Sequence, residues 1–336
     1  MFFSTECYFN PLFVITHMAF RSGNTQDRGR SGVVFATVLA ILAAVFYAVS
    51  SPVSKVLLES LSPTMMASLL YLGAGIGLSV YLGARRAVGH RSPEPALEKP
   101  DMPYVVGMVV LDIAAPILLM VGLSMTSAAN ASLLNNFEIV ATSLVALVVF
   151  KEAISPKLWC AIMLVTVASI MLSVEDLGGF VFSTGSLFVL AACVCWGFEN
   201  NCTRMISSKD PVHITVIKGM FSGLGSLVIA AALGELVFDP VLVVSALCLG
   251  FVSYGLSITC YIRAQRDLGA ARVSAYYAIA PFIGVTLSLL MFREMPGTVF
   301  IAALAVMVAG TWLIARDSFD AEKESETGSK AVAGTV

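Results

Sequence analysis

The chain has few charged residues, and this indicates the class of protein to which it belongs. Only 12% of its 336 residues are Asp, Glu, Lys or Arg, against ~25% in an average soluble domain. Hydrophobic residues make up 58% of the chain, and the mean hydropathy is +0.88. We therefore predict an integral membrane protein surrounded by membrane lipid. We also expect no nucleic-acid partner.

Reactive motifs are missing as well. The seven cysteines include no CxxC pair, which argues against a disulfide framework and against a metal site. The three histidines have no carboxylate or cysteine at ligand spacing, and no HExxH, GxSxG or P-loop motif occurs; such motifs are typical of metalloproteases, serine hydrolases and ATP-driven pumps. We expect no metal, no cofactor and no enzymatic activity.

Apolar segments fill most of the chain. They are mostly about 18–22 residues long, which is the length at which a helix crosses the hydrocarbon core of a bilayer. We predict ten transmembrane helices, near residues 33–50, 65–82, 104–123, 129–150, 158–174, 185–201, 212–234, 241–262, 274–292 and 299–315. The short connections leave no room for a soluble domain, so the fold class is an all-α integral membrane protein.

The two ends of the chain are more polar than the rest. We predict a cytoplasmic N-terminal extension over residues 1–31 and a cytoplasmic disordered tail over 317–336. The first seventeen residues, MFFSTECYFNPLFVITH, lack the basic leader of a signal peptide. Because Met18 opens a more ordinary start, we expect residues 1–17 to be dispensable.

The positions of Lys and Arg predict the orientation. If the N-terminus is cytoplasmic, all of the 20 Lys and Arg residues fall on the cytoplasmic side except Lys55, Arg293 and Lys218. Lys55 and Arg293 then lie outside, and Lys218 lies within a span. Cytoplasmic loops of membrane proteins carry an excess of Lys and Arg, so both termini of this multi-pass protein should be cytoplasmic.

The two halves of the chain repeat each other. FKEAIS at Phe150–Ser155 has a counterpart in FREMPG at Phe292–Gly297, 142 positions later. We predict a first five-helix repeat over residues 32–176 and a second over 181–316. Because five is odd, the second repeat must lie inverted relative to the first. Inverted repeats place their substrate near the bilayer midplane, between the halves.

Ten spans in two halves, each with a Phe-basic-Glu signature at the end of its fourth helix, resemble the drug/metabolite transporter superfamily, EamA type. The likeness covers roughly residues 33–316. It implies a secondary transporter of the plasma membrane, in which Glu152 and Glu294 are the structural signature. Pro281 matches a proline usual in the family, whereas the first repeat has Ile139 at that position. We expect both glutamates to bond the amides that open the next helix.

The fourth predicted span carries unusual polar residues. Asn135, Asn136 and Glu138 fall on one side of a helix running through Ser127–Glu152, and the other side is wholly apolar. A carboxylate at that depth costs at least ~2.5 kcal/mol on insertion scales. We interpret Glu138 as a proton- or substrate-binding group steadied by the Asn135 amide; packing by hydrogen bonds alone is the alternative.

Other polar residues lie at similar depth. Asp112 lies near the centre of the third span, and its counterpart in the second half is Tyr254, as Tyr277 is the counterpart of Asn135. We expect a pseudo-symmetric cavity for an organic solute, with acids and amides from one half and tyrosine rings from the other. Core packing is the alternative role of the tyrosines.

A further polar group interrupts the sixth span. Glu199 and Lys218 occur at matched depth in the sixth and seventh spans, and each alone in hydrocarbon would be costly, so we expect them to pair. Together with Asn200 and Asn201 they form a candidate inner gate, or else a structural ion pair.

These features predict a secondary transporter that moves a small organic solute (a metabolite, amino acid or drug) by alternating access at a midplane site. The expected partners are the small-molecule solute, a proton or other coupling ion, and membrane lipid, with a homodimer as one option. An intramembrane enzyme, or a membrane receptor or scaffold protein without transport activity, is the alternative function.

Overall fold

The computed structural model describes residues 30–87, 97–151, 154–176, 181–268 and 270–333. Our predictions for residues 1–17 and for Glu152 lie outside these ranges. The helices of the first half are α2 (Arg30–Ala48), α3 (Ser50–Leu57), α4 (Pro63–Ala87), the 3₁₀ turn η1 (Lys99–Asp101), α5 (Met102–Met125), α6 (Ala128–Leu134), α7 (Phe137–Phe150) and α8 (Pro156–Ser173).

The second half begins after a short hairpin. In it, β1 (Val174–Asp176) pairs antiparallel with β2 (Val181–Phe182). The helices that follow are α9 (Thr184–Met205), α10 (Pro211–Ile217), the π-helical turn η2 (Lys218–Ser222), α11 (Gly223–Ala232), α12 (Pro240–Gly250), the π-helical turn η3 (Phe251–Leu256), α13 (Ser257–Leu268), α14 (Ala270–Tyr277), α15 (Ala280–Phe292) and α16 (Thr298–Ala333).

Short polar sequences start several of these helices. Asp210 and Asp239 each precede a proline, and each side chain accepts hydrogen bonds from backbone N–H groups of the first turn of its helix. Ser127 and Ser155 cap α6 and α8 in the same way. A short polar acceptor before the first turn satisfies amides that have no partner within the helix, and proline is favoured at the first helical position.

The described part of the chain is almost wholly helical, as predicted. Eight helical stretches are long and apolar enough to cross a membrane; these are Gly32–Leu57, Pro63–Ala87, Lys99–Met125, Ala128–Val149, Pro156–Ser173, Pro211–Ala232, Pro240–Gln265 and Thr298–Asp317. Two of the ten predicted spans are not among them. The sixth, α9, is long enough but carries several polar residues, and the ninth is divided into α14 and α15.

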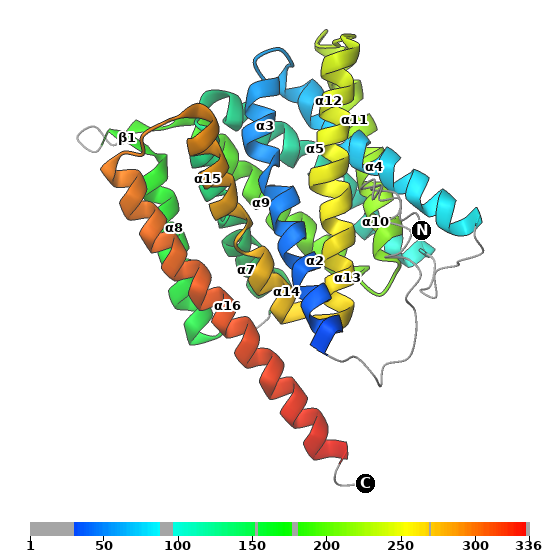
Figure 1. Ribbon diagram of the computed structural model, residues 1–336, viewed down its shortest axis with the longest axis vertical. Coiled ribbons are helices and arrows are strands. Elements are labelled where there is room, and N and C mark those ends of the chain that lie inside the picture. Colours follow the sequence, from blue (N-terminus) through cyan, green and yellow to red (C-terminus); the bar gives the residue numbers. More distant parts are fainter. Residues whose placement is uncertain (1–29, 88–96, 152–153, 177–180, 269, 334–336) are drawn as a thin grey trace, which may run out of the picture.

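Helix packing interleaves the two halves. α5 packs along α9, and α2 packs along α13. α8 packs along α16, and these two helices form one edge of the molecule in Figure 1. α6 contacts α15, while α4 contacts both α11 and α12. Each of these contacts joins a helix of the first half to one of the second. A cavity at the centre of this bundle is therefore built from both halves.

The fourth span is broken, which corrects our prediction of one continuous helix through Ser127–Glu152. α6 ends at Leu134 and α7 begins at Phe137. The Asn136 side chain donates to the Leu133 carbonyl oxygen at 3.1 Å, so it competes with the backbone bonding of a regular helix. The ninth span is broken at the matching place, just before Pro281, whose ring cannot continue a helix without loss of a backbone bond.

The ends of α7 and α15 also match. Lys151 and Arg293, the basic residues of the two Phe-basic-Glu sequences, have φ of 55° and 53°. They are the non-glycine residues with positive φ in the described part of the chain. A left-handed residue is a common way to end a helix, although glycine usually provides it. The sequence repeat therefore has a counterpart in the backbone.

Glycines allow α4 and α12 to approach closely. A Cβ added at Gly73 would lie 2.1 Å from the Leu247 carbonyl oxygen, and one at Gly250 would lie 2.1 Å from that of Leu70. Such close backbone contact is the usual reason for small residues at membrane helix interfaces.

The C-terminal tail differs from our expectation of disorder. Helix α16 continues to Ala333, so residues 317–333 are helical in the structure. Ala, Glu and Lys are frequent there, and these residues have high helix propensity.

Candidate functional site

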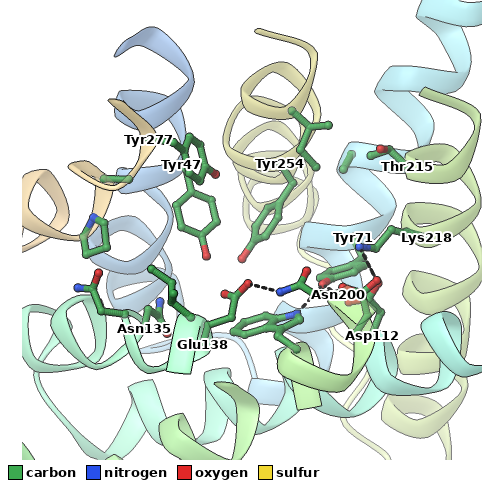
Figure 2. Close-up of a pocket in the computed structure, with 18 of the residues that line it drawn as sticks. Tyr47, Tyr71, Asp112, Asn135, Glu138, Asn200, Thr215, Lys218, Tyr254 and Tyr277 are labelled. Atoms are coloured by element: carbon green, nitrogen blue, oxygen red, sulfur yellow. Dashed lines mark hydrogen bonds and ion pairs between the residues drawn. The ribbon is translucent and has the colours of Figure 1, made fainter. Parts of the chain in front are cut away.

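A cavity of about 330 Å³ lies between the two halves. Its volume is at the lower end of the range for small-molecule sites, ~300–1,000 Å³. Figure 2 shows its polar lining. The lining residues are Tyr47, Tyr71, Ala74, Asp112, Asn135, Asn136, Glu138, Ile139, Trp196, Glu199, Asn200, Thr215, Lys218, Gly219, Tyr254, Ile258, Tyr277, Ala278, Ala280 and Pro281.

One wall holds a cluster of three charged side chains. Lys218 Nζ lies 2.8 Å from Glu199 Oε1 and 3.4 Å from Asp112 Oδ2. The side chains of Asp112 and Glu199 are buried, whereas Lys218 is 20% exposed. The pair expected between Glu199 and Lys218 is therefore present, and Asp112 joins it. The similar depth of Glu199 and Lys218 in the sequence predicted their contact. It gave no reason to expect Asp112, from the third span, in the same cluster.

Neighbouring side chains hold this charged cluster in place. The Tyr71 hydroxyl donates to Asp112 Oδ1 at 2.9 Å, and Trp196 Nε1 donates to the Tyr71 hydroxyl oxygen at 3.4 Å. The Thr203 hydroxyl donates to Glu199. Lys218 itself begins the π-helical turn η2, and such turns are frequent at functional sites. Tyr71 and Trp196 were missed because an aromatic residue in an apolar span gives no sequence signal of its own.

Glu138 is held by a different amide from the one we expected. Asn200 Nδ2 on α9 donates to Glu138 Oε1 at 2.7 Å and to the Thr142 hydroxyl oxygen at 3.2 Å. The break between α6 and α7 separates Asn135 from this contact. Asn135 instead lines the cavity with a buried Oδ1 that has no hydrogen-bond partner among the described residues.

A layer of tyrosines covers Glu138. Tyr47 lies between Tyr254 and Tyr277, with ring centroids 5.9 Å and 5.5 Å away, and Tyr71 lies 5.6 Å from Tyr254. In Figure 2 the hydroxyls of Tyr47 and Tyr254 point toward the Glu138 carboxyl group. Tyr47 and Tyr71 come from the first half of the chain. The expected division, with acids in one half and tyrosines in the other, is therefore wrong: both halves supply both kinds of side chain.

Two other predicted residues lie outside the cavity lining. Asn201 is buried against its own helix and α7, where its Nδ2 donates to the carbonyl oxygens of Gly197 and Thr142 at 2.8 Å and 3.1 Å. Glu294 is exposed directly after Arg293, and its capping role stays a prediction. Pro281 does line the cavity, at the start of α15.

Among the described residues, no group of three His, Cys, Asp or Glu side chains is placed to hold a metal ion. The cavity offers carboxylates, amides, one ammonium group and phenol rings. Several apolar helices packed around a polar cavity define a multi-pass membrane protein, and this architecture is typical of a membrane transporter.

Comparison with known proteins places the chain within that class. The EamA-like transporter family matches residues 34–174 and again residues 183–316. The chain therefore belongs to the EamA-like transporter family, within the drug/metabolite transporter superfamily. The matched family is a family of transporters.

A similar curated protein agrees with this assignment, and a solved structure shares the fold. An uncharacterized transporter of Methanothermobacter thermautotrophicus is 27% identical over 270 residues, which is 76% of this chain and 78% of that protein. A protein crystal structure shares the fold with a TM-score of 0.59 at 17% identity, covering 83% of this chain and 94% of its own.

Proposed function

We propose that this protein is a secondary transporter that moves a small organic solute across the plasma membrane by alternating access. The observation that supports this most directly is the cavity, which both halves of the chain line with acids, amides and tyrosines. Ionisable residues within a membrane bundle are costly and usually mark a solute or ion pathway.

We further propose that the bundle has ten spans in two inverted five-helix repeats, with both termini cytoplasmic. In this arrangement α9 is the sixth span, and α14 with α15 forms the ninth. The two matches to the family support a repeat, as do the matching breaks in the fourth and ninth spans. Rocking of one repeat against the other would open the cavity to each side in turn.

Proton coupling is assigned to Glu138, with Asp112 as the reserve candidate. Glu138 borders the cavity, and its hydrogen-bond donor there is the neutral amide of Asn200. Asp112 is instead tied to Lys218, together with Glu199. A carboxyl group without a lysine partner can take up a proton on one side and release it on the other. The Lys218 cluster with Asn200 would then be an inner gate, whose ion pairs hold α5, α9 and η2 together.

Reconstituted protein can test this assignment directly. Liposomes containing the purified protein and a trapped pH-sensitive dye would be exposed to a panel of amino acids, sugars and organic cations. We expect at least one solute to produce an internal pH change with the wild-type protein. Glu138→Gln keeps the side-chain shape and should abolish this signal, while solute exchange without a gradient persists when the solute is supplied at a saturating concentration.

Asp112→Asn should be measured beside it as the comparison. If Glu138→Gln transport still follows an imposed pH gradient, Glu138 is not the coupling site. If both variants keep that dependence, another group carries the coupled proton; if the wild-type protein shows no such dependence, the protein is a facilitator or an exchanger. Conversion of a solute into a new compound, with no movement across the liposome membrane, would instead favour the intramembrane enzyme.

A further inference from the structure

The cavity has a surplus of negative charge. Its described lining contains three carboxyl groups, those of Asp112, Glu138 and Glu199, and one cationic side chain, that of Lys218. Lys218 already contacts both Asp112 and Glu199. Glu138 therefore faces the cavity without a cation of its own. Because an unpaired charge is costly in a low-dielectric interior, a cationic solute would supply the missing partner.

Several oxygen atoms of the cavity lining can accept a hydrogen bond from a solute. Asn200 occupies only one of the two carboxyl oxygens of Glu138. Asn135, whose side chain is more than nine-tenths buried, presents an Oδ1 with no partner among the described residues. Tyr47 and Tyr254 direct their hydroxyls toward the same carboxyl group (Figure 2). A phenol hydroxyl both donates and accepts, and that of Tyr254 already accepts from the Ser50 hydroxyl at 3.4 Å. An ammonium group has three donors and no acceptor, so it matches this set of oxygens.

The remaining walls fit an apolar or aromatic body. Around the tyrosine rings, the cavity is lined by Ile139, Ile258, Ala280 and Pro281. Aromatic faces also attract cations, and the attraction strengthens when the site is dry. A solute with one ammonium group on a compact hydrocarbon skeleton would therefore satisfy both parts of the cavity.

A carboxylate on the solute would find no equivalent site. The lysine that could bind it is shared between two buried carboxyl groups, which hold it at one wall. Placing a further anion in this cavity would add a fourth negative charge to the described lining. The site should for this reason distinguish an amine from the amino acid with the same side chain.

We propose that the cavity binds organic amines through Glu138 and the hydroxyls of Tyr47 and Tyr254, and that it selects them over amino acids. This inference rests on the proposed transport function and narrows its solute class.

Three compounds of similar shape but different charge test which charge the cavity selects. Phenethylamine carries the ammonium group alone, phenylalanine adds a carboxylate, and 2-phenylethanol is neutral. Binding to the purified full-length protein in detergent would be measured at pH 7 by calorimetry and by thermal shift. We expect phenethylamine to bind at least about tenfold more tightly than either of the others, because charge-assisted bonds to Glu138 are strong and a stranded carboxylate is costly. Equal or tighter binding of phenylalanine or of 2-phenylethanol would overturn the proposal.

Variants then locate the site. Glu138→Gln should weaken phenethylamine binding at least about tenfold, whereas Glu59→Gln, at an exposed position outside the cavity, should leave it unchanged. Should Glu138→Gln fail to fold, Tyr47→Phe keeps the ring and removes one oxygen, and should weaken binding about three- to tenfold. Unchanged binding of phenethylamine by a folded Glu138→Gln protein would also overturn the proposal. If only the Tyr47→Phe variant folds, unchanged binding by that variant would overturn it.

The binding measurement needs no gradient, so its failure is distinct from failure of transport. Should phenethylamine not bind while liposomes transport an amino acid or a sugar, the amine site is wrong and the transporter stands. Should phenethylamine bind at Glu138 and no solute cross the liposome membrane, the binding site stands and the transport function is wrong.

Discussion

Removal of the Lys218 charge is the sharpest test of how the cavity wall is held. Lys218 lies between two carboxyl groups that are 0% and 2% exposed, those of Asp112 and Glu199. Lys218→Met keeps the length of the side chain but leaves both carboxyl groups without their cation. Breaking a buried ion pair by removing one partner costs about 3–5 kcal/mol.

The size of this loss can be followed by thermal unfolding in detergent. At ~2–4 °C per kcal/mol for chains of 150–250 residues, the midpoint should fall by an amount on the order of 10 °C. Lys99→Met, at an exposed position in η1, is the matched control and should change little. Lowering the pH should return part of the lost stability to Lys218→Met, because protonation removes the stranded charges.

Neutralising the acids as well should rescue the variant. The triple change Lys218→Met, Asp112→Asn and Glu199→Gln leaves no buried charge in the cluster, so it should unfold at a higher temperature than Lys218→Met alone. Residues that interact show such non-additive losses. If the three single losses simply add, or if Lys218→Met unfolds like the wild type, the charged cluster does not hold the wall as described.

Two further predictions concern packing and topology. Gly73→Ala should destabilise the protein by about 1–3 kcal/mol, because the added Cβ would meet the Leu247 backbone. Gly83→Ala is the control: nothing lies within 4 Å of its added Cβ, so it should be nearly neutral in the same unfolding assay. Reporter fusions at Lys330 should lie in the cytoplasm and those between residues 174 and 185 outside; an external Lys330 reporter would contradict ten spans with a cytoplasmic N-terminus.

The sequence by itself determined the class of the protein and much of its organisation. Long apolar segments and scarce charge are sufficient for a helical membrane bundle, because hydrocarbon demands that backbone groups bond within each helix. The repeat was visible in FKEAIS and FREMPG, and the left-handed Lys151 and Arg293 occupy matching places in those two segments. Glu138, Asp112 and Glu199 stood out for a similar reason, since an acid within a span is expensive wherever it points.

Matched depth in the sequence predicted the pair of Glu199 and Lys218, but only the tertiary structure decided the other contacts between side chains of the cavity. Periodicity on a regular helix put Asn135 beside Glu138, but the break at Asn135 and Asn136 gives that place to Asn200, a residue of another span. Contacts between distant segments depend on the rotation and depth of each helix. A sequence pattern does not determine these precisely enough to predict a single hydrogen bond. Tyr47 and Tyr71 could not be predicted for the same reason, since a tyrosine in an apolar span gives the same sequence pattern whether it faces lipid or a cavity. Only the packing of the two halves places these rings in the cavity wall.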